Sequence, residues 1–237
     1  MYVVLADRTD HAALWLCSNL QAHLSQPVVH ITPAQLVYST AITHRLETDH
    51  VHSQFRLADG SMLDFDKVSG VINRFGDMPT AHLDRAEKSE RDYAATELQA
   101  FLLGWLASVD CPVLNPPSPD WLGGSWHSPM ASAEIAAQVG LTHQPNPLSS
   151  DTAPTPDDPN IPTDPYFVCN NRLIGPLVDS QLRDALISFA HAWGSPLVQI
   201  DMRSGANGPE FIRASSFVDF TRGGGTLTRA IAQALAS

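Results

Sequence analysis

Residues 2–31, YVVLADRTDHAALWLCSNLQAHLSQPVVHI, decide the fold class of this chain. The apolar run at 2–5 predicts a buried strand, and the run at 27–31 predicts a second one. Between them, apolar residues recur with the spacing of an amphipathic helix at Leu14, Leu16, Leu20 and Leu24. A strand, a helix and a strand in this order are typical of a parallel sheet, so we expect an α/β fold.

The next segments extend this sheet and add a hairpin. Residues 50–65 alternate between apolar and polar side chains around Asp59-Gly60, a strong hairpin signal. Residues 68–74 (VSGVINR) predict another buried strand, whose polar end is Asn73-Arg74. Because ligands of open α/β sheets bind at the carboxyl ends of the strands, this end is a candidate site.

Two further helices are predicted in the first 145 residues. The longer covers 84–108, with Tyr93 and Trp105 on its apolar side, and the shorter covers 130–139 and is closed by Gly140. A short strand at 111–115 lies between them and leads into a loop rich in Trp, Gly and Ser.

A proline-rich stretch separates the chain into two parts. Seven prolines fall between 145 and 165, which predicts a linker or an extended surface loop at 146–165. The expected domains are therefore 1–145 and 166–237. In the second part, the pattern predicts a strand pair turning at Asn170-Asn171, a helix at 181–193, strands at 197–202 and within 210–220, and a last helix at 226–236.

The glycines at 223–225 stand just before that last helix. They have two interpretations: a flexible connection, which is favoured, or an anion site beside Arg222 at the N-terminus of the helix.

The charge balance argues against a nucleic-acid binder. The chain has 25 Asp and Glu against 14 Lys and Arg, a net charge of −11, and its only lysines are Lys67 and Lys88. Sequence-independent binding of phosphates needs a clustered basic face, which the sequence lacks. Since no run is long enough to span a bilayer and no signal peptide is present, we expect no membrane partner and a cytoplasmic protein. The three cysteines are expected to be reduced core residues.

Histidine clusters give one candidate metal site. His44, His50 and His52 lie close in sequence, and the spacing of the last two places both rings on one face of a strand, where they could hold zinc or copper. Only Glu47 or Asp49 lies nearby as a further ligand, so a surface strand is the favoured interpretation. No sequence motif for a serine nucleophile, a phosphate loop or a dinucleotide site is present.

Two tryptophans lie where no helical stripe requires them. Trp121 and Trp126 occupy the Gly/Ser-rich loop, and Phe75 directly follows Arg74 at a predicted strand end. Exposed tryptophans are frequent anchors in peptide and protein interfaces, although they also act as lids over a local core.

The order of features from 71 to 116 resembles the N-terminal region of ATP-grasp ligases, in particular the RimK-like and microviridin-type peptide ligases. The matching features are Asn73-Arg74, Met78-Pro79, the run 90–97, Phe101-Leu-Leu-Gly104 and Val113-Leu-Asn-Pro116. Residues 136–141 and the final strands and helix are similar to later parts of the same family. The resemblance implies an open, mostly parallel sheet with flanking helices, followed by a trimmed ATP-grasp α/β remnant.

Departures from the family imply that ATP-dependent ligation is lost. The family's magnesium motif is an acidic residue followed two positions on by Asn, whereas this chain has Arg213 and Ser215 there. Arg213 is a cation where Mg²⁺ needs an anionic oxygen. The family's first lysine falls near Pro129, and the nucleotide-binding centre is expected to be deleted at the proline-rich stretch. We therefore expect no cofactor, no metal and no catalysis.

Together these observations predict a non-catalytic accessory protein that holds a precursor peptide for a tailoring enzyme, in the pathway of a ribosomally made and modified peptide. Such proteins occur in crocagin-type pathways, and a homodimer formed through the Trp105 helix follows from the same resemblance. The predicted peptide-binding residues are Arg74, Phe75, Trp121, Trp126 and Arg213. Two alternatives remain: metal binding, and acid–base chemistry on a peptide by His127 or His143 with Asp110 or Asp120.

Overall fold

A four-stranded parallel sheet organises the N-terminal part of the computed structural model, which describes residues 1–119, 121–143, 162–205 and 208–236. Its strands, in spatial order, are β2 (Val28–Ile31), β1 (Tyr2–Ala6), β6 (Gly70–Arg74) and β7 (Val113–Leu114). All neighbours pair in parallel, which confirms the sheet predicted from residues 2–31 and 68–74.

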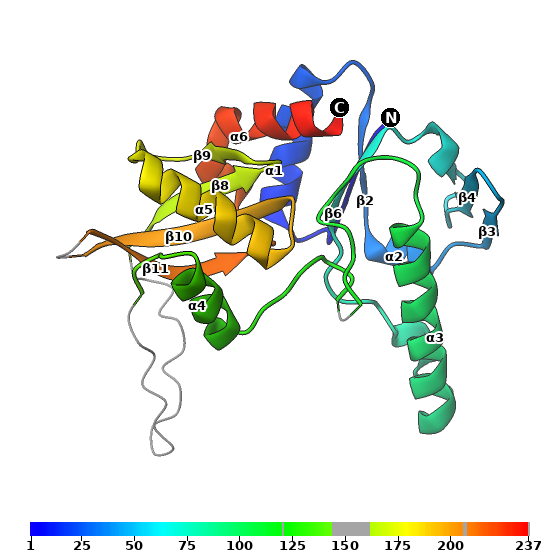
Figure 1. The fold of residues 1–237 in the computed structure, drawn as a ribbon. Coiled ribbons are helices and arrows are strands. Elements are labelled where there is room, and N and C mark those ends of the chain that lie inside the picture. Colours follow the sequence, from blue (N-terminus) through cyan, green and yellow to red (C-terminus); the bar gives the residue numbers. More distant parts are fainter. Residues whose placement is uncertain (120, 144–161, 206–207, 237) are drawn as a thin grey trace.

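Helix α1 (His11–Leu20) covers one face of this sheet. It begins at Asp10, whose carboxylate accepts a hydrogen bond from the Ala13 amide, and it buries Leu16 and Leu20. Its other side packs along α6 (Phe220–Leu235), and both helices share one hydrophobic cluster with β1 (Figure 1). The two ends of the chain are therefore held together by apolar packing.

The opposite face of the sheet is covered by a small antiparallel sheet and two helices. The elements are β3 (Ala41–Leu46), β4 (Val51–Arg56), β5 (Met62–Asp64), α2 (Pro33–Val37) and α3 (Lys88–Ala107). β4 and β5 form the hairpin predicted at Asp59-Gly60, where Gly60 has a positive φ of 85°. β3 was not predicted, because this edge strand is largely exposed and lacks the apolar alternation of its neighbour.

Helix α3 is buried only at its C-terminal end. Trp105 lies in the core against Phe55 and Phe65, whereas Tyr93, predicted on the same apolar side, is exposed. The N-terminal half of α3 projects beyond the sheets (Figure 1). Because Trp105 is enclosed within one chain, its side chain is not available for the predicted dimer contact.

A second, antiparallel sheet forms the C-terminal part. Its strands, in order, are β11 (Gly208–Ser215), β10 (Leu197–Gly205), β8 (Asp164–Cys169) and β9 (Arg172–Ile174). Along β8, Phe167 and Cys169 face α6, while Tyr166 and Val168 face α5 (Ser180–Trp193) and α4 (Pro129–Gln138). This alternation buries both faces of the sheet.

Two boundaries differ from the prediction. Residues 144–161 of the proline-rich stretch lie outside the described residues, but Asp164 and Pro165 belong to β8, so the predicted linker extends too far. The last helix begins at Phe220 and is kinked at Gly224, where φ is 55° and ψ is −155°. Gly223 is also tightly packed, since a Cβ there would lie 2.4 Å from Leu227. The kink and the close packing explain why glycines stand at 223 and 224. They favour the interpretation of this segment as a connection over its interpretation as an anion site.

Candidate functional site: an aromatic groove beside a masked carboxylate

Buried asparagines fasten the carboxyl edge of the parallel sheet to the C-terminal part. Asn73 donates from Nδ2 to the carbonyl oxygens of Asn115 and Leu122, each at 2.7 Å. Asn115 in turn donates to the Ser216 carbonyl at 2.9 Å and accepts from the Ser195 hydroxyl at 2.6 Å. These bonds fix the loop after β7 and the segment after β11 relative to one another.

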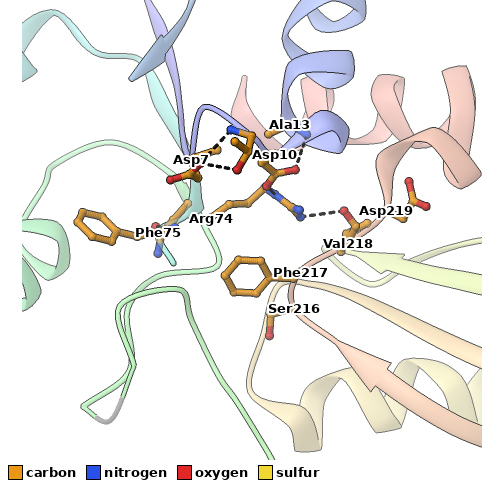
Figure 2. Close-up of polar contacts among 12 residues, drawn as sticks. Asp7, Asp10, Ala13, Arg74, Phe75, Ser216, Phe217, Val218 and Asp219 are labelled. Atoms are coloured by element: carbon orange, nitrogen blue, oxygen red, sulfur yellow. Dashed lines mark hydrogen bonds and ion pairs between the residues drawn. The ribbon is translucent and has the colours of Figure 1, made fainter. Parts of the chain in front are cut away.

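Arg74, at the end of β6, lies inside this junction. Figure 2 shows its side chain between Asp10 and the segment 216–219. Nε donates to Asp10 at 2.6 Å and Nη1 donates to the Val218 carbonyl at 2.8 Å, with the guanidinium over the rings of Phe217 and Phe220. The side chain is only 7% exposed, so Arg74 joins two parts of the fold and does not line an open surface.

Phe75 is likewise absent from the surface. Its ring is fully buried in the cluster on the α3 side of the sheet, and Figure 2 shows it pointing away from Phe217. Its amide is held by the Asn73 side chain at 3.0 Å. The expectation that Arg74 and Phe75 line an accessible peptide groove therefore conflicts with their burial.

The other three predicted residues border two adjoining cavities. Two adjoining cavities of about 240 and 80 Å³ lie between the loop 121–129 and the segment 212–217, and we call them together the aromatic groove. Trp126 and His127 line both cavities, Arg213 lines the larger and Trp121 the smaller. Trp126 is 69% exposed and Trp121 is 36% exposed, so two large apolar rings border the groove.

His127 is fixed within the groove wall. Its Nε2 donates to the Trp193 carbonyl at 3.0 Å, and its ring meets the Trp193 ring edge-to-face at 4.5 Å between centroids. Asp110, one of its proposed acid–base partners, instead accepts from the Val51 amide at 3.1 Å and contacts His50. The described contacts of His127 do not include Asp110, and Asp120 lies outside the described residues. His143, the other candidate, forms an isolated bridge to Phe211.

Beside the groove, a buried carboxylate is shared by two arginines. Asp201 on β10 accepts from Arg213 Nε at Oδ2, at 2.9 Å, and from Arg222 Nη1 at Oδ1, at 3.1 Å. Gln199 also donates to Oδ1 at 3.0 Å. The Asp201 side chain is 3% exposed, whereas each arginine is 31% exposed. The arginines thus shield the carboxylate from solvent.

These residues do not fit the magnesium ion that the family resemblance implies. Mg²⁺ needs anionic oxygen ligands with open lone pairs, and both oxygens of Asp201 already accept charge-assisted hydrogen bonds. Arg213 occupies the position of the expected acidic ligand and adds a positive charge next to the carboxylate. Sequence reasoning missed the role of Asp201 and Arg222, although an aspartate inside the apolar run 197–202 was a usable signal.

The structure places the three histidines that were predicted as metal ligands in two different surroundings. His44 Nδ1 contacts the Ser53 hydroxyl at 2.9 Å and its ring packs against Phe101. His50 and His52 instead meet Asp66, which sequence proximity did not suggest. Burial raises the pKa of Asp66, but hydrogen bonds and charges from His52 and His50 outweigh it and hold that pKa below its ordinary value.

The cysteines are not suited to nucleophilic chemistry. Burial raises the pKa of Cys17 to about 11 and that of Cys169 to about 12, and it also raises the pKa of Cys111. Near neutral pH all three are protonated thiols, and the thiolate is the reactive form.

Comparisons of the sequence with protein-family models and with curated proteins give no match. None of the helices in the described part of the chain combines the length and the apolarity needed to cross a bilayer.

The fold, in contrast, matches solved ATP-grasp ligases. The macrocyclase MdnC from Microcystis aeruginosa MRC, crystallised with the precursor peptide MdnA, aligns at a TM-score of 0.73 and 13% identity over 99% of both chains. MdnB from the same organism aligns at 0.70 and 14% identity, over 99% of this chain and 98% of its own. A RiPP-associated ligase from Chryseobacterium gregarium, in complex with ADP and a leader and core peptide, aligns at 0.72 and 10% identity, over 99% and 96%. The chain therefore has the α/β fold of these ATP-grasp ligases.

Proposed function

We propose that this protein binds a precursor peptide in the biosynthesis of a ribosomally made, post-translationally modified peptide and presents it to a tailoring enzyme, without ligating it. The peptide role is supported by the fold, because the structures of the similar MdnC and Chryseobacterium gregarium ligases contain bound peptides. The observation that carries the non-catalytic role is the pair of arginines on Asp201. Assembly as a homodimer belongs to the same proposal.

The arginines oppose metal-assisted phosphate chemistry in two ways. A cation at Asp201 would have to displace two guanidinium groups from a carboxylate that is almost fully buried. It would also be repelled by the positive charge of Arg213. Coulomb's law gives a repulsion of about 4 kcal/mol for two unit charges 4 Å apart at an effective ε of 20. The two lysines add no phosphate ligand nearby, because each forms an exposed local pair, Lys67 with Asp64 and Lys88 with Asp92.

The aromatic groove offers apolar and charged side chains that can bind a peptide. Trp126 and Trp121 offer large rigid apolar surfaces, and such residues dominate interface energies. At the groove, Arg213 presents a partly exposed guanidinium that can pair with a carboxylate of the peptide. The net charge of −11 favours a peptide that also carries basic segments.

Trp126→Ala is expected to weaken peptide binding at least about tenfold, because it removes the most exposed ring of the groove. The measurement is isothermal titration calorimetry with the precursor peptide encoded beside the gene. Tyr93→Ala is the matched control, since Tyr93 is similarly exposed, at 67%, but lies on α3. Equal losses in both variants, or no binding by the unmodified protein, would contradict the proposal.

A second candidate function rests on His127, which lines both cavities of the groove. It is the one histidine among the described residues of that lining, and histidine is the side chain most often used for general acid–base catalysis. Incubating the peptide with the protein alone tests this candidate. A changed mass or chirality that is lost in His127→Gln would support an enzyme over a binding protein.

A further inference from the structure

A cluster of imidazole and carboxylate groups lies apart from the aromatic groove, on the β4 side of the fold. Its members are His50 before β4, His52 on β4, and Asp66 in the short 3-10 helix Phe65–Lys67. One ligand atom from each lies within 4.8 Å of the others. No other group of three such side chains is this close among the residues that the structure describes.

The carboxylate of Asp66 lies close to both imidazole rings. Asp66 Oδ2 lies 2.6 Å from His52 Nδ1 and 3.6 Å from His50 Nε2. Donor atoms of a tetrahedral zinc ion are about 3.3 Å apart, given metal–ligand distances near 2.0–2.1 Å. The two separations from Asp66 bracket that value and the two nitrogens lie within 4.8 Å of each other, so side-chain rotations can bring all three atoms into coordination. When zinc binds, it replaces the proton that now joins His52 to Asp66.

His50 also has the outer support that metal-binding histidines usually have. Its second ring nitrogen, Nδ1, lies 3.0 Å from Asp110 Oδ2. Asp110 is itself positioned, because the same oxygen accepts from the Val51 amide at 3.1 Å. A carboxylate that accepts a hydrogen bond from Nδ1–H fixes the tautomer in which Nε2 carries the lone pair toward the metal.

From this geometry we propose a zinc site with His50 Nε2, His52 Nδ1 and Asp66 Oδ2 as ligands and Asp110 as the residue that orients His50. Two nitrogens and one carboxylate oxygen form a donor set typical of zinc with one position left for water. The site is reachable, since the His50 side chain is 50% exposed. Bound zinc would tie β4 to the 3-10 helix that follows β5 and, through Asp110, to the connection between α3 and β7.

The test uses full-length protein without a histidine tag, titrated with zinc chloride by calorimetry. One equivalent is expected to bind, and His52→Gln is expected to weaken it at least about tenfold. Asp110→Asn is expected to weaken binding by about tenfold, because it removes only the orienting partner. His23→Gln, which removes a histidine outside the cluster, is expected to leave the affinity unchanged.

A second readout separates this site from the three thiols. Cobalt(II) in place of zinc should give visible bands of nitrogen and oxygen coordination without a thiolate charge-transfer band, and His52→Gln should abolish them. Zinc should also raise the melting temperature of the unmodified protein and of His23→Gln, but not of His52→Gln. No zinc binding, undiminished binding in His52→Gln, or a thiolate band would overturn the proposal.

Discussion

Replacing Arg74 by methionine is expected to lower the free energy of unfolding by about 3–5 kcal/mol, the usual loss when one partner of a buried ion pair is removed. The variant leaves the Asp10 carboxylate without its cation and the Val218 carbonyl without its donor. It also removes the guanidinium from the faces of Phe217 and Phe220. Urea denaturation followed by circular dichroism measures the loss.

Two further variants test whether loss of the ion pair causes the decrease in the free energy of unfolding. Arg74→Met/Asp10→Asn should lose less than the sum of the two single variants, because it removes the unpaired charge together with its partner. Arg74→Lys should fall between Met and Arg, since a lysine supplies charge but not the two directed bonds. A loss below about 1 kcal/mol in Arg74→Met, the value typical of an exposed pair, would contradict the buried junction.

The second large effect concerns Trp105. Trp105→Ala is expected to destabilise the protein by about 3–5 kcal/mol, because it empties a core site packed against Phe55 and Phe65. Trp105→Phe should cost less than about 1.5 kcal/mol, since it keeps an aromatic ring and discards an indole N–H for which the described residues supply no hydrogen-bond partner.

Tyr93→Ala is the control on the same helix. Its ring is exposed, so the change should stay within about 0.5 kcal/mol. Thermal or urea unfolding of the three variants gives the comparison. If Tyr93→Ala matched Trp105→Ala, the exposed end of α3 would have to be packed against something, which would point to the dimer contact that Trp105 itself does not make.

Short apolar runs and turn residues made several strands and the parallel sheet predictable. β1 is a continuous apolar run, β2 and β6 each contain a short one, and the turns at Asp59-Gly60 and Asn170-Asn171 carry residues that accept positive φ angles. The edge strand β3 has no buried face to impose a pattern, so nothing in its sequence marked it.

The candidate site was only partly predictable, for a related reason. Trp121 and Trp126 were recognisable because their loop gave them no core role. Arg74 seemed exposed because its partners are distant in sequence: Asp10 precedes it by 64 residues and Val218 follows it by 144. The pattern of neighbouring residues in the sequence cannot reveal contacts between residues that lie so far apart along the chain. The same limit hid Asp66 and Asp110, which only the folded chain brings to the histidines.

The contacts that Arg213 and Arg222 make with Asp201 become visible only in the folded structure. The sequence shows that Arg213 stands where an acidic ligand is expected, but it does not show what the guanidinium contacts. In the structure the guanidinium binds the one buried carboxylate that its neighbouring strand provides, and Arg222 takes the other oxygen. One buried carboxylate therefore pairs with two partly exposed guanidinium groups.

The most direct test of the central claim is mass spectrometry of the precursor peptide after incubation with the protein, ATP and Mg²⁺, at concentrations where calorimetry shows the peptide bound. We predict a bound peptide of unchanged mass, with or without ATP. An ATP-dependent loss of water from the peptide, the signature of a newly formed amide or ester, would contradict the account.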